Sequence, residues 1–230
     1  MKLSRIQALL AALVIAVAGC GPRAAEGPAT LRIYLARHGQ TDWNAERRLQ
    51  GQTDRMLDET GRRQAAQLAE SLRGIRLDAV YSSTLGRSRE TADIARGGVP
   101  LTSMDGLRER AIGKFEGLRL AGEDTASVSE FRRRSQDPED SLDGGESSTQ
   151  FYVRVRQAFE AIRDRHPAGT ILVVGHGGTN QMILRTLFDL APEQAESIRQ
   201  ANDEIYMIEI EAGMPPRLWK RIAAANLSDL

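Results

Sequence analysis

From about residue 31 onward, short apolar runs alternate with longer segments whose apolar residues recur at helical spacing. The run Ile171-Leu172-Val173-Val174 is uninterrupted, which is typical of a strand buried on both faces of a sheet. Residues 31–36 form another strand-like run. A long helix is predicted from about Ser147 to Arg165, where these apolar residues share one face: Phe151, Val155, Ala158, Phe159 and Ile162.

The remaining elements follow the same two patterns. Further strands are expected at 78–81, 99–104, 205–211 and 218–222, with 205–211 alternating in the manner of an edge strand. Further helices are expected to begin at Thr60 or Gly61, at Ser83 or Thr84, and after Gly178. Residues 105–145 are polar and are expected to be irregular with one short helix. Because strands alternate with helices, the sequence predicts an α/β fold, a three-layer sandwich with a mostly parallel central sheet.

The N-terminus has the pattern of an export signal. Lys2 and Arg5 precede an apolar stretch, 6–18, which is shorter than the roughly 20 residues that span a bilayer and has the length of a signal-peptide core. It ends in Val17-Ala18-Gly19-Cys20, which resembles the bacterial lipobox, where cleavage precedes a cysteine that carries lipid. We expect residues 1–19 to be a lipoprotein signal peptide and Cys20 to be the lipidation site. A plain secretory signal and an uncleaved anchor are the alternatives.

This reading of the N-terminus also divides the chain. Residues 20–30, rich in Gly, Pro and Ala, are expected to be a tether, and 31–230 a single folded domain. The protein would then be lipid-anchored in the bacterial cell envelope on the periplasmic side. Acyl chains on Cys20 would hold it there, and stable attachment generally takes more than one such chain. Gly21 stands where lipoproteins retained at the inner membrane carry Asp, and by that resemblance we expect outer-membrane sorting.

Charge narrows the class of ligand. The chain has 31 basic and 31 acidic residues and is formally neutral, so no general affinity for nucleic acid is expected. A small anionic substrate would have to be held by a local cluster of positive charge. Cys20 is the single cysteine, so an intramolecular disulfide is excluded.

Two histidines occupy matching places in the pattern. His38 follows the strand 31–36 and His176 follows 171–174, and a glycine comes directly after each. The carboxyl ends of parallel strands lie at the same edge of a sheet, where α/β proteins bind ligands and where helix N-termini present free N–H groups to anions. We therefore expect these two side chains to meet, although they are far apart in sequence.

Phosphoryl transfer gives such a pair a role. A neutral imidazole can attack phosphorus and divide the reaction into two steps, provided that a backbone carbonyl fixes its tautomer. Arginine suits the equatorial phosphate oxygens because its guanidinium is planar and permanently charged. Arg37 adjoins His38, and Arg87 lies near the start of a predicted helix. A carboxylic acid is needed for the leaving oxygen, and Glu109 is the candidate, with Glu116 and Glu123 as alternatives.

Seven segments, in order from about residue 31 to 210, resemble the motifs of the histidine phosphatase superfamily (phosphoglycerate mutase-like branch). One RHG tripeptide would be weak support, whereas seven ordered segments are strong support. They are Arg37-His38-Gly39-Gln40-Thr41 with Asn44; Arg48-Leu49-Gln50-Gly51; Thr60-Gly61 with Gln64-Ala65; Tyr81-Ser82-Ser83 with Arg87 and Thr91-Ala92; Leu107-Arg108-Glu109 with Gly113, Phe115-Glu116-Gly117; Gly145-Glu146-Ser147; and Gly175-His176-Gly177-Gly178.

The resemblance implies a metal-independent phosphoric monoester hydrolase with no cofactor and a phosphorylated small molecule as substrate. His38 resembles the phosphorylated nucleophile, Glu109 the proton donor, and His176 a catalytic partner in the phosphate pocket. The implied substrate-binding residues are Arg37, Asn44, Gln50, Gly51, Arg87 and the backbone N–H of Gly177. The chain departs from the family at Thr179-Asn180-Gln181, where relatives often carry Gly-Gly-x-x-Arg, and at Thr84, where Asp is common.

Other functions remain open at this point. A non-catalytic envelope lipoprotein that binds phosphate is one, and a phosphoglycerate mutase is another, although the short segment 118–145 and the predicted export favour a phosphatase. A metal site at His38 and His176 is disfavoured because the neighbouring arginines would oppose a cation. The sequence does not identify the substrate or the oligomeric state, and residues 118–150 are expected to govern substrate choice.

Overall fold

One mixed sheet of six strands organises the part of the chain that the computed structural model describes, residues 29–121 and 124–222. The strands are β1 (Thr30–Arg37), β2 (Ala79–Ser83), β3 (Leu101–Met104), β4 (Gly169–Gly175), β5 (Glu204–Glu211) and β6 (Arg217–Ile222). Their order across the sheet is β3-β2-β4-β1-β5-β6. The first four in this order run parallel, whereas β5 is antiparallel to both of its neighbours. Strands β1 and β4, which carry the two histidine motifs, are therefore direct neighbours.

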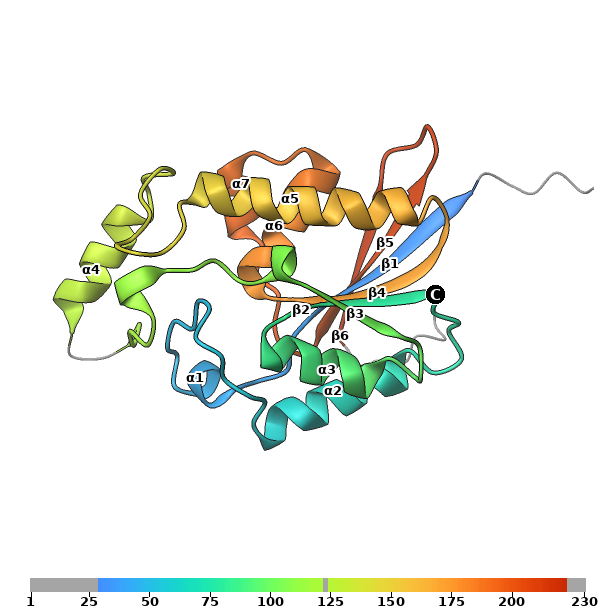
Figure 1. The fold of residues 1–230 in the computed structure, drawn as a ribbon, viewed down its shortest axis with the longest axis horizontal. Coiled ribbons are helices and arrows are strands. Elements are labelled where there is room, and N and C mark those ends of the chain that lie inside the picture. The colour runs from blue at the N-terminus through green and yellow to red at the C-terminus, as the bar shows by residue number, and fades with distance from the viewer. Residues whose placement is uncertain (1–28, 122–123, 223–230) are drawn as a thin grey trace, which may run out of the picture.

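Helices cover both faces of this sheet (Figure 1). On one face lie α2 (Glu59–Ser71) and α3 (Gly86–Ala95), and on the other α5 (Ser148–Arg165) and α6 (Gly177–Phe188). The other helices of the described residues are α1 (Asp42–Ala45), α4 (Thr125–Arg134) and α7 (Pro192–Ser197), and two 3₁₀ turns span Asp105–Leu107 and Gly113–Phe115. Helix α4 lies beyond the sheet, at the end of the molecule toward which β1 runs (Figure 1).

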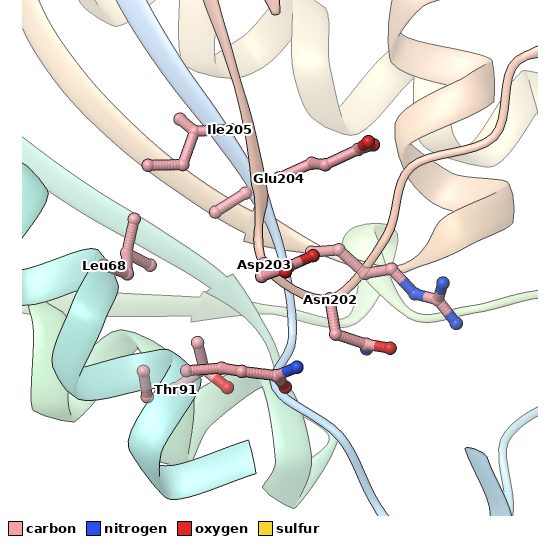
Figure 2. Close-up of a pocket in the computed structure, with 10 residues that line it drawn as sticks. Leu68, Thr91, Asn202, Asp203, Glu204 and Ile205 are labelled. Atoms are coloured by element: carbon pink, nitrogen blue, oxygen red, sulfur yellow. The ribbon is translucent and has the colours of Figure 1, made fainter. Parts of the chain in front are cut away.

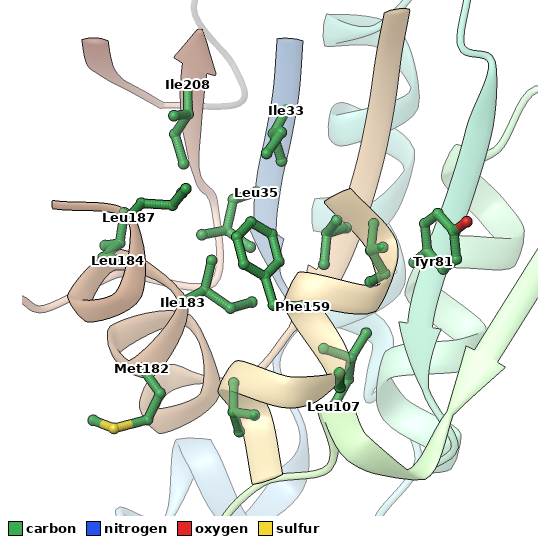
Figure 3. Close-up of a cluster of buried hydrophobic side chains, with 14 of the residues drawn as sticks. Ile33, Leu35, Tyr81, Leu107, Phe159, Met182, Ile183, Leu184, Leu187 and Ile208 are labelled. Atoms are coloured by element: carbon green, nitrogen blue, oxygen red, sulfur yellow. The ribbon is translucent and has the colours of Figure 1, made fainter. Parts of the chain in front are cut away.

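The alternation of side chains along the strands produces two cores. Ile33 and Leu35 of β1 pack on the α5 and α6 side with Phe159 and Ile183, as Figure 3 shows. The intervening Tyr34 and Ala36 pack on the α2 and α3 side. Val173 and Val174 of β4 are also divided between the two faces and are fully buried, which explains the uninterrupted apolar run in the sequence. The predicted three-layer α/β fold is thus confirmed.

The expectation that 205–211 forms an edge strand is wrong. Strand β5 lies between β1 and β6, and the edge of the sheet is β6. The polar positions that suggested an edge are instead paired across the sheet: Glu209 binds Arg32 of β1 and Arg217 of β6. Cross-strand ion pairs of this kind keep polar residues in an interior strand.

The start of α3 also differs from the expected cap by Ser83 or Thr84. The helix begins at Gly86, and its N-cap residue Leu85 has no side chain that can accept a hydrogen bond. The carboxylate of Asp54, from a distant loop, accepts the N–H of Gly86 instead. A cap supplied from a remote segment leaves no local pattern in the sequence. By contrast, α5 is capped by residues of its own first turn, with Ser147 and Gln150 in a capping box.

The predicted signal peptide, residues 1–19, lies outside the described residues, as do Cys20 and the tether as far as residue 28. Within the described ranges, every helix is too short or too polar to cross a bilayer.

Candidate active site

The two histidines meet where β1 and β4 end. Arg37 pairs with Gly175 in the parallel register, and the N–H of His38 donates to the carbonyl oxygen of Gly175 at 3.0 Å. This backbone bond places the next residue, His176, beside His38, with ring centroids 5.1 Å apart. Adjacent central strands therefore bring together two residues that are distant in sequence.

His38 has the form expected of a nucleophile. Its side chain is buried, and Nδ1 donates to the carbonyl oxygen of Gly39 at 2.7 Å. Burial, followed by the charges of Arg87 and Arg37, holds the pKa of His38 well below its usual value of 6.5. The ring is therefore neutral at neutral pH, and with the proton on Nδ1 the lone pair is on Nε2.

Arg87 is a buried cation held by three acceptors. Its Nη2 donates to the carbonyl oxygen of Gly51 at 2.7 Å, Nη1 to that of Thr53 at 2.9 Å, and Nε to His176 Nδ1 at 3.3 Å. Burial lowers its pKa to about 10, so it remains charged at neutral pH. A guanidinium has five N–H donors, which leaves two of them for a ligand.

Both ring nitrogens of His176 contact protein groups. Since Nδ1 accepts from Arg87, the proton is on Nε2, which lies 2.7 Å from the hydroxyl oxygen of Ser83. Burial, followed by the charge of Arg87, lowers the pKa of His176 well below its usual value. A bound phosphate could contact this ring only by replacing one of these bonds, and the 3.3 Å bond from Arg87 is the longer.

Arg37 contributes a second guanidinium with an unused donor. Its Nη1 donates to the carbonyl oxygen of Gln200 at 2.8 Å, while its Nε is buried without a hydrogen-bond partner among the described residues. Burial lowers its pKa. Arg37 also lines a small pocket between α2, α3 and the loop that carries Asn202 and Asp203 (Figure 2), but His38, Arg87 and His176 are not among the residues that line it. This Nε–H is therefore a donor that the described residues leave available to a ligand oxygen.

Glu109 reaches the same site from the segment after β3. Its Oε2 accepts the N–H of Gly178 at 2.9 Å, and its Oε1 accepts the N–H of Arg110 at 2.9 Å. The carboxylate is near enough to Arg37 and Arg87 to raise the pKa of each, against the lowering by burial. A Cβ on Gly178 would lie 2.5 Å from Glu109 Oε1, so glycine is needed at this contact.

The four other predicted binding residues differ in how they relate to this centre. Asn44 Oδ1 accepts from the backbone and hydroxyl of Thr41, and its Nδ2 has no partner among the described residues. Gln50 is buried, and its Oε1 is likewise unpaired within the described ranges. Gly51 touches Arg87 through its carbonyl group, and Gly177 begins α6 against the Arg37 guanidinium. The structure thus brings together His38, His176, Arg37, Arg87, Glu109, Gly51 and Gly177, whereas no contact in the described residues joins the side chains of Asn44 and Gln50 to them.

Some residues of the site were not singled out from the sequence. Ser83 belongs to one of the family motifs and was expected as a helix cap, but it was given no role in the site, where it contacts His176. Asn202 donates to the carbonyl oxygen of His38 at 2.6 Å, and no motif marks it. The departures from the family at Thr179 and Asn180 are buried and bind backbone carbonyl groups of neighbouring segments, so they support the site and are closed to substrate.

Positive charge dominates the residues around the two imidazoles. Within residues 29–121 and 124–222, no group of three or more His, Cys, Asp or Glu side chains is arranged to hold a metal ion. The arrangement combines a neutral nucleophile, two cations with spare donors and one carboxyl group. It can bind a tetrahedral oxyanion and exchange a proton with it.

Comparison with known proteins agrees with this chemistry. The sequence profile of the histidine phosphatase superfamily (branch 1) matches residues 33–220. A protein of Cronobacter sakazakii named "Probable phosphoglycerate mutase GpmB" is 35% identical over 187 residues, covering 79% of this chain and 86% of the relative.

Solved phosphatases have the same fold. A mycobacterial glucosyl-3-phosphoglycerate phosphatase in complex with VO3 matches with a TM-score of 0.71 and 28% identity, over 85% of this chain and 99% of the other. Phosphoserine phosphatase from Entamoeba histolytica, in complex with 3-phosphoglyceric acid, matches with a TM-score of 0.69 and 26% identity, over 82% and 94%. These similarities support a phosphatase, and the chain belongs to the histidine phosphatase superfamily.

Proposed function

We propose that this protein is a phosphomonoester hydrolase that works through a phosphohistidine on His38. The observation that carries the proposal is the meeting of a buried neutral imidazole with two guanidinium groups that have donors to spare, one of them the orphan Nε of Arg37. A phosphate monoester would satisfy those donors with its equatorial oxygens. The superfamily membership of the chain supports the same conclusion.

The proposed reaction has two steps. His38 Nε2 attacks phosphorus in line, the bond from phosphorus to the leaving oxygen breaks, and the Glu109 carboxyl group gives its proton to that oxygen. Glu109 then takes a proton from water as the water oxygen attacks the phosphohistidine, which releases phosphate and restores neutral His38. Arg37 and Arg87 stabilise the charge on the equatorial oxygens in both steps.

Turnover of p-nitrophenyl phosphate by the purified full chain tests the proposal. We expect measurable hydrolysis, and we expect His38→Ala to lower kcat by at least about 10³-fold because the covalent route is lost. Labelled phosphate should appear on the wild-type chain in an acid-labile, alkali-stable form and be absent from His38→Ala. Equal rates for the two proteins would overturn the proposal.

We further propose that catalysis is independent of metal. The two arginines supply the positive charge that a metal ion would otherwise provide at the phosphate. Dialysis against a strong chelator should therefore leave kcat/KM unchanged. A loss of activity that is restored by a divalent cation would contradict this.

A mutase is the second candidate because the relative from C. sakazakii carries that name. Conversion of 3-phosphoglycerate to 2-phosphoglycerate, followed by coupled assay, decides between the two. A phosphatase should release inorganic phosphate without isomerisation. For the physiological substrate, a panel of sugar phosphates, nucleotides, phosphopeptides and lipid-linked phosphates should be ranked by kcat/KM.

We also propose that the protein is anchored in the bacterial envelope by lipid on Cys20, facing the periplasm. The support is the sequence of residues 1–20, in which a short apolar stretch leads to Val17-Ala18-Gly19-Cys20. Incorporation of labelled fatty acid into the wild-type chain, and its loss in Cys20→Ala, is the expected result. Separation of the inner and outer membranes then tests the sorting that Gly21 favours.

A further inference from the structure

The loop formed by residues 50–54 contacts the start of α3 at two consecutive residues. The carbonyl groups of Gly51 and Thr53 accept from the two Nη atoms of Arg87, and the carboxylate of Asp54 accepts the N–H of Gly86 at 2.8 and 2.9 Å. The direction of the Arg87 guanidinium is therefore set by this loop as well as by its own helix.

Glu116 holds the loop in place. Its Oε1 accepts the N–H of Gln52 at 2.8 Å, and its Oε2 accepts the N–H of Thr53 at 2.8 Å together with the Thr53 hydroxyl group. Gly51 has a positive φ of 54°, and a Cβ there would lie 2.3 Å from Glu116 Oε1. The close approach of the loop to this carboxylate thus depends on glycine in a left-handed conformation.

The same loop contacts the segment that carries Glu109. The side-chain amide of Gln52 donates to the carbonyl oxygen of Glu109 at 3.0 Å. Glu116 lies seven residues after Glu109 in the same segment, so its bonds to the loop are a second contact between the loop and this segment. The negative charge of Glu116 also acts on Arg87, whose pKa it raises against the effect of burial.

We infer that Glu116 is a positioning residue, which orients Arg87 for phosphate by fixing the carbonyl groups of Gly51 and Thr53. The inference rests on the proposed function, in which Arg87 binds the phosphoryl group. Both carboxylate oxygens of Glu116 are bonded to the loop, so its effect on phosphate passes through Arg87. Loss of these bonds leaves Arg87 charged but free to adopt orientations that miss the anion.

The Glu116→Gln variant of the full chain tests this inference. The amide keeps the size of the side chain but replaces one accepting oxygen with an NH₂ group. That NH₂ group would face the backbone N–H of Gln52 or Thr53, so two donors would meet and one hydrogen bond would be lost. We expect the Kd for inorganic phosphate, measured by calorimetry, to rise about tenfold, the scale of one weakened charge-assisted hydrogen bond. The KM for p-nitrophenyl phosphate should rise with it, and Glu116→Asp, which retains both oxygens, should recover part of the loss. Glu70→Gln, an exposed glutamate on α2, is the matched control.

A structural role alone would give a different pattern. If Glu116 acts through Arg87, then Glu116→Gln should have no further effect on phosphate binding in an Arg87→Ala background. An equal loss in both backgrounds, or a lowered Tm with an unchanged phosphate Kd, would overturn the inference. If the wild-type chain neither binds phosphate nor hydrolyses the ester, the proposed function itself fails, and that result is distinct from a failure confined to the variant.

Discussion

At the scale of the residue, the site separates the nucleophile from the charge. His38 is kept neutral by burial and by the neighbouring cations, while Arg87 and Arg37 retain their charge despite being buried. A charged imidazole would have no lone pair at Nε2 and would repel the arginines. The lowered pKa of His38 therefore keeps the lone pair on Nε2 available, while the carbonyl group of Gly39 holds the proton on Nδ1.

Gly178 offers a test of how Glu109 is placed. A Cβ there would lie 2.5 Å from Glu109 Oε1 and 3.2 Å from Phe151, so Gly178→Ala should displace the carboxyl group. We expect kcat/KM for alkyl phosphates, which reports on phosphoryl transfer to His38 and not on hydrolysis of the phosphohistidine, to fall roughly 10²-fold, the scale of general acid catalysis. The loss of kcat/KM should be smaller for p-nitrophenyl phosphate, whose leaving group needs no proton. Glu109→Gln should give the same dependence on the leaving group. An equal loss for both substrates in Gly178→Ala would contradict this account of the contact.

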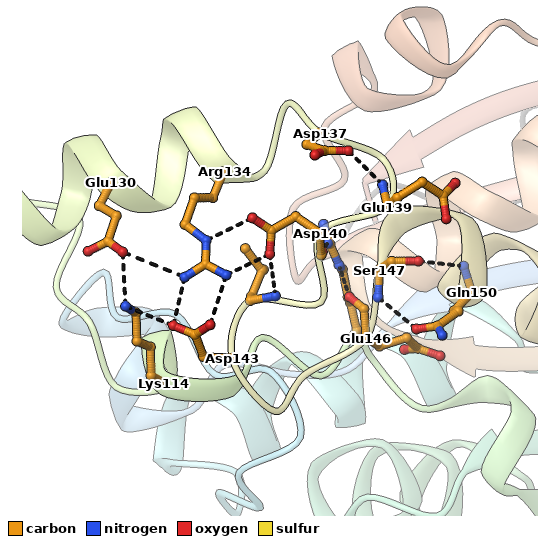
Figure 4. A network of polar contacts seen from close by, with 12 residues as sticks. Lys114, Glu130, Arg134, Asp137, Glu139, Asp140, Asp143, Glu146, Ser147 and Gln150 are labelled. Carbon is orange, nitrogen blue, oxygen red and sulfur yellow. Dashed lines mark hydrogen bonds and ion pairs between the residues drawn. The ribbon is translucent and has the colours of Figure 1, made fainter.

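At the scale of the element, α4 and the turn that follows it are joined by charge. Arg134 binds Asp140 and Asp143, and Lys114 binds Glu130 and Asp143 (Figure 4). A small apolar cluster beside them contains Ile112, Phe115 and Leu142, separate from the two cores of the sheet. This part of the chain therefore depends on its own contacts for order, because few sheet contacts support it.

Replacement of Arg134 should loosen this segment selectively. We expect Arg134→Ala to accelerate amide hydrogen exchange in residues 125–145 while β1 and β4 remain protected, since local opening follows the loss of local contacts. Arg132→Ala is the matched control because Arg132 is an exposed arginine of the same helix that has no ion pair among the described residues. Equal exchange in the two variants, or loss of protection throughout the sheet, would contradict the assignment.

At the scale of the whole molecule, the two buried histidines link stability to pH. Both have a pKa lowered well below 6.5, so the native state excludes protons that the unfolded chain binds. The contribution of the two neutral histidines to the free energy of unfolding is fully present above pH 6.5. It falls as the pH decreases below 6.5, by up to about 1.4 kcal/mol per pH unit for each histidine. Asp140, whose pKa is lowered to about 2 from its usual 3.8 by Arg134, adds to the loss only at more acidic pH.

This linkage is measurable by urea unfolding between pH 7.5 and 5. The free energy of unfolding of the wild-type chain should fall as the pH is lowered across this range. In His38→Gln the slope should be about half as steep, because the unfolded variant takes up one proton where the unfolded wild-type chain takes up two. A flat profile for the wild-type chain would show that the imidazoles are protonated in the native state.

The sequence predicted the large elements better than the contacts between remote segments. The uninterrupted run of β4 and the helical spacing in α5 identified their elements because burial imposes those patterns directly. The short helices α1 and α7 were missed because four and six residues are too few to show a period.

The motifs identified the predicted site residues, but they did not reveal the contacts that hold those residues in place. Asp54 at the start of α3 and Asn202 at His38 act through contacts between segments that only the fold brings together. Ser83 lies in a motif, but its contact with His176 likewise depends on the fold. The prediction that β5 is an edge strand was wrong for a similar reason. Its polar residue Glu209 is paired with Arg32 of β1 and Arg217 of β6, and the sequence of β5 alone does not reveal these partners.

The central place of β1 in the sheet has a consequence for the order in which the protein can assemble. Of the six strands in the described residues, β1 is synthesised first, but both of its neighbours, β4 and β5, belong to the last third of the chain. A nascent polypeptide that stops before Gly169 therefore has His38 without a partner strand on either side. Assembly of the site therefore has to wait until most of the chain has been made, because the two strands that flank β1 are among the last to be synthesised.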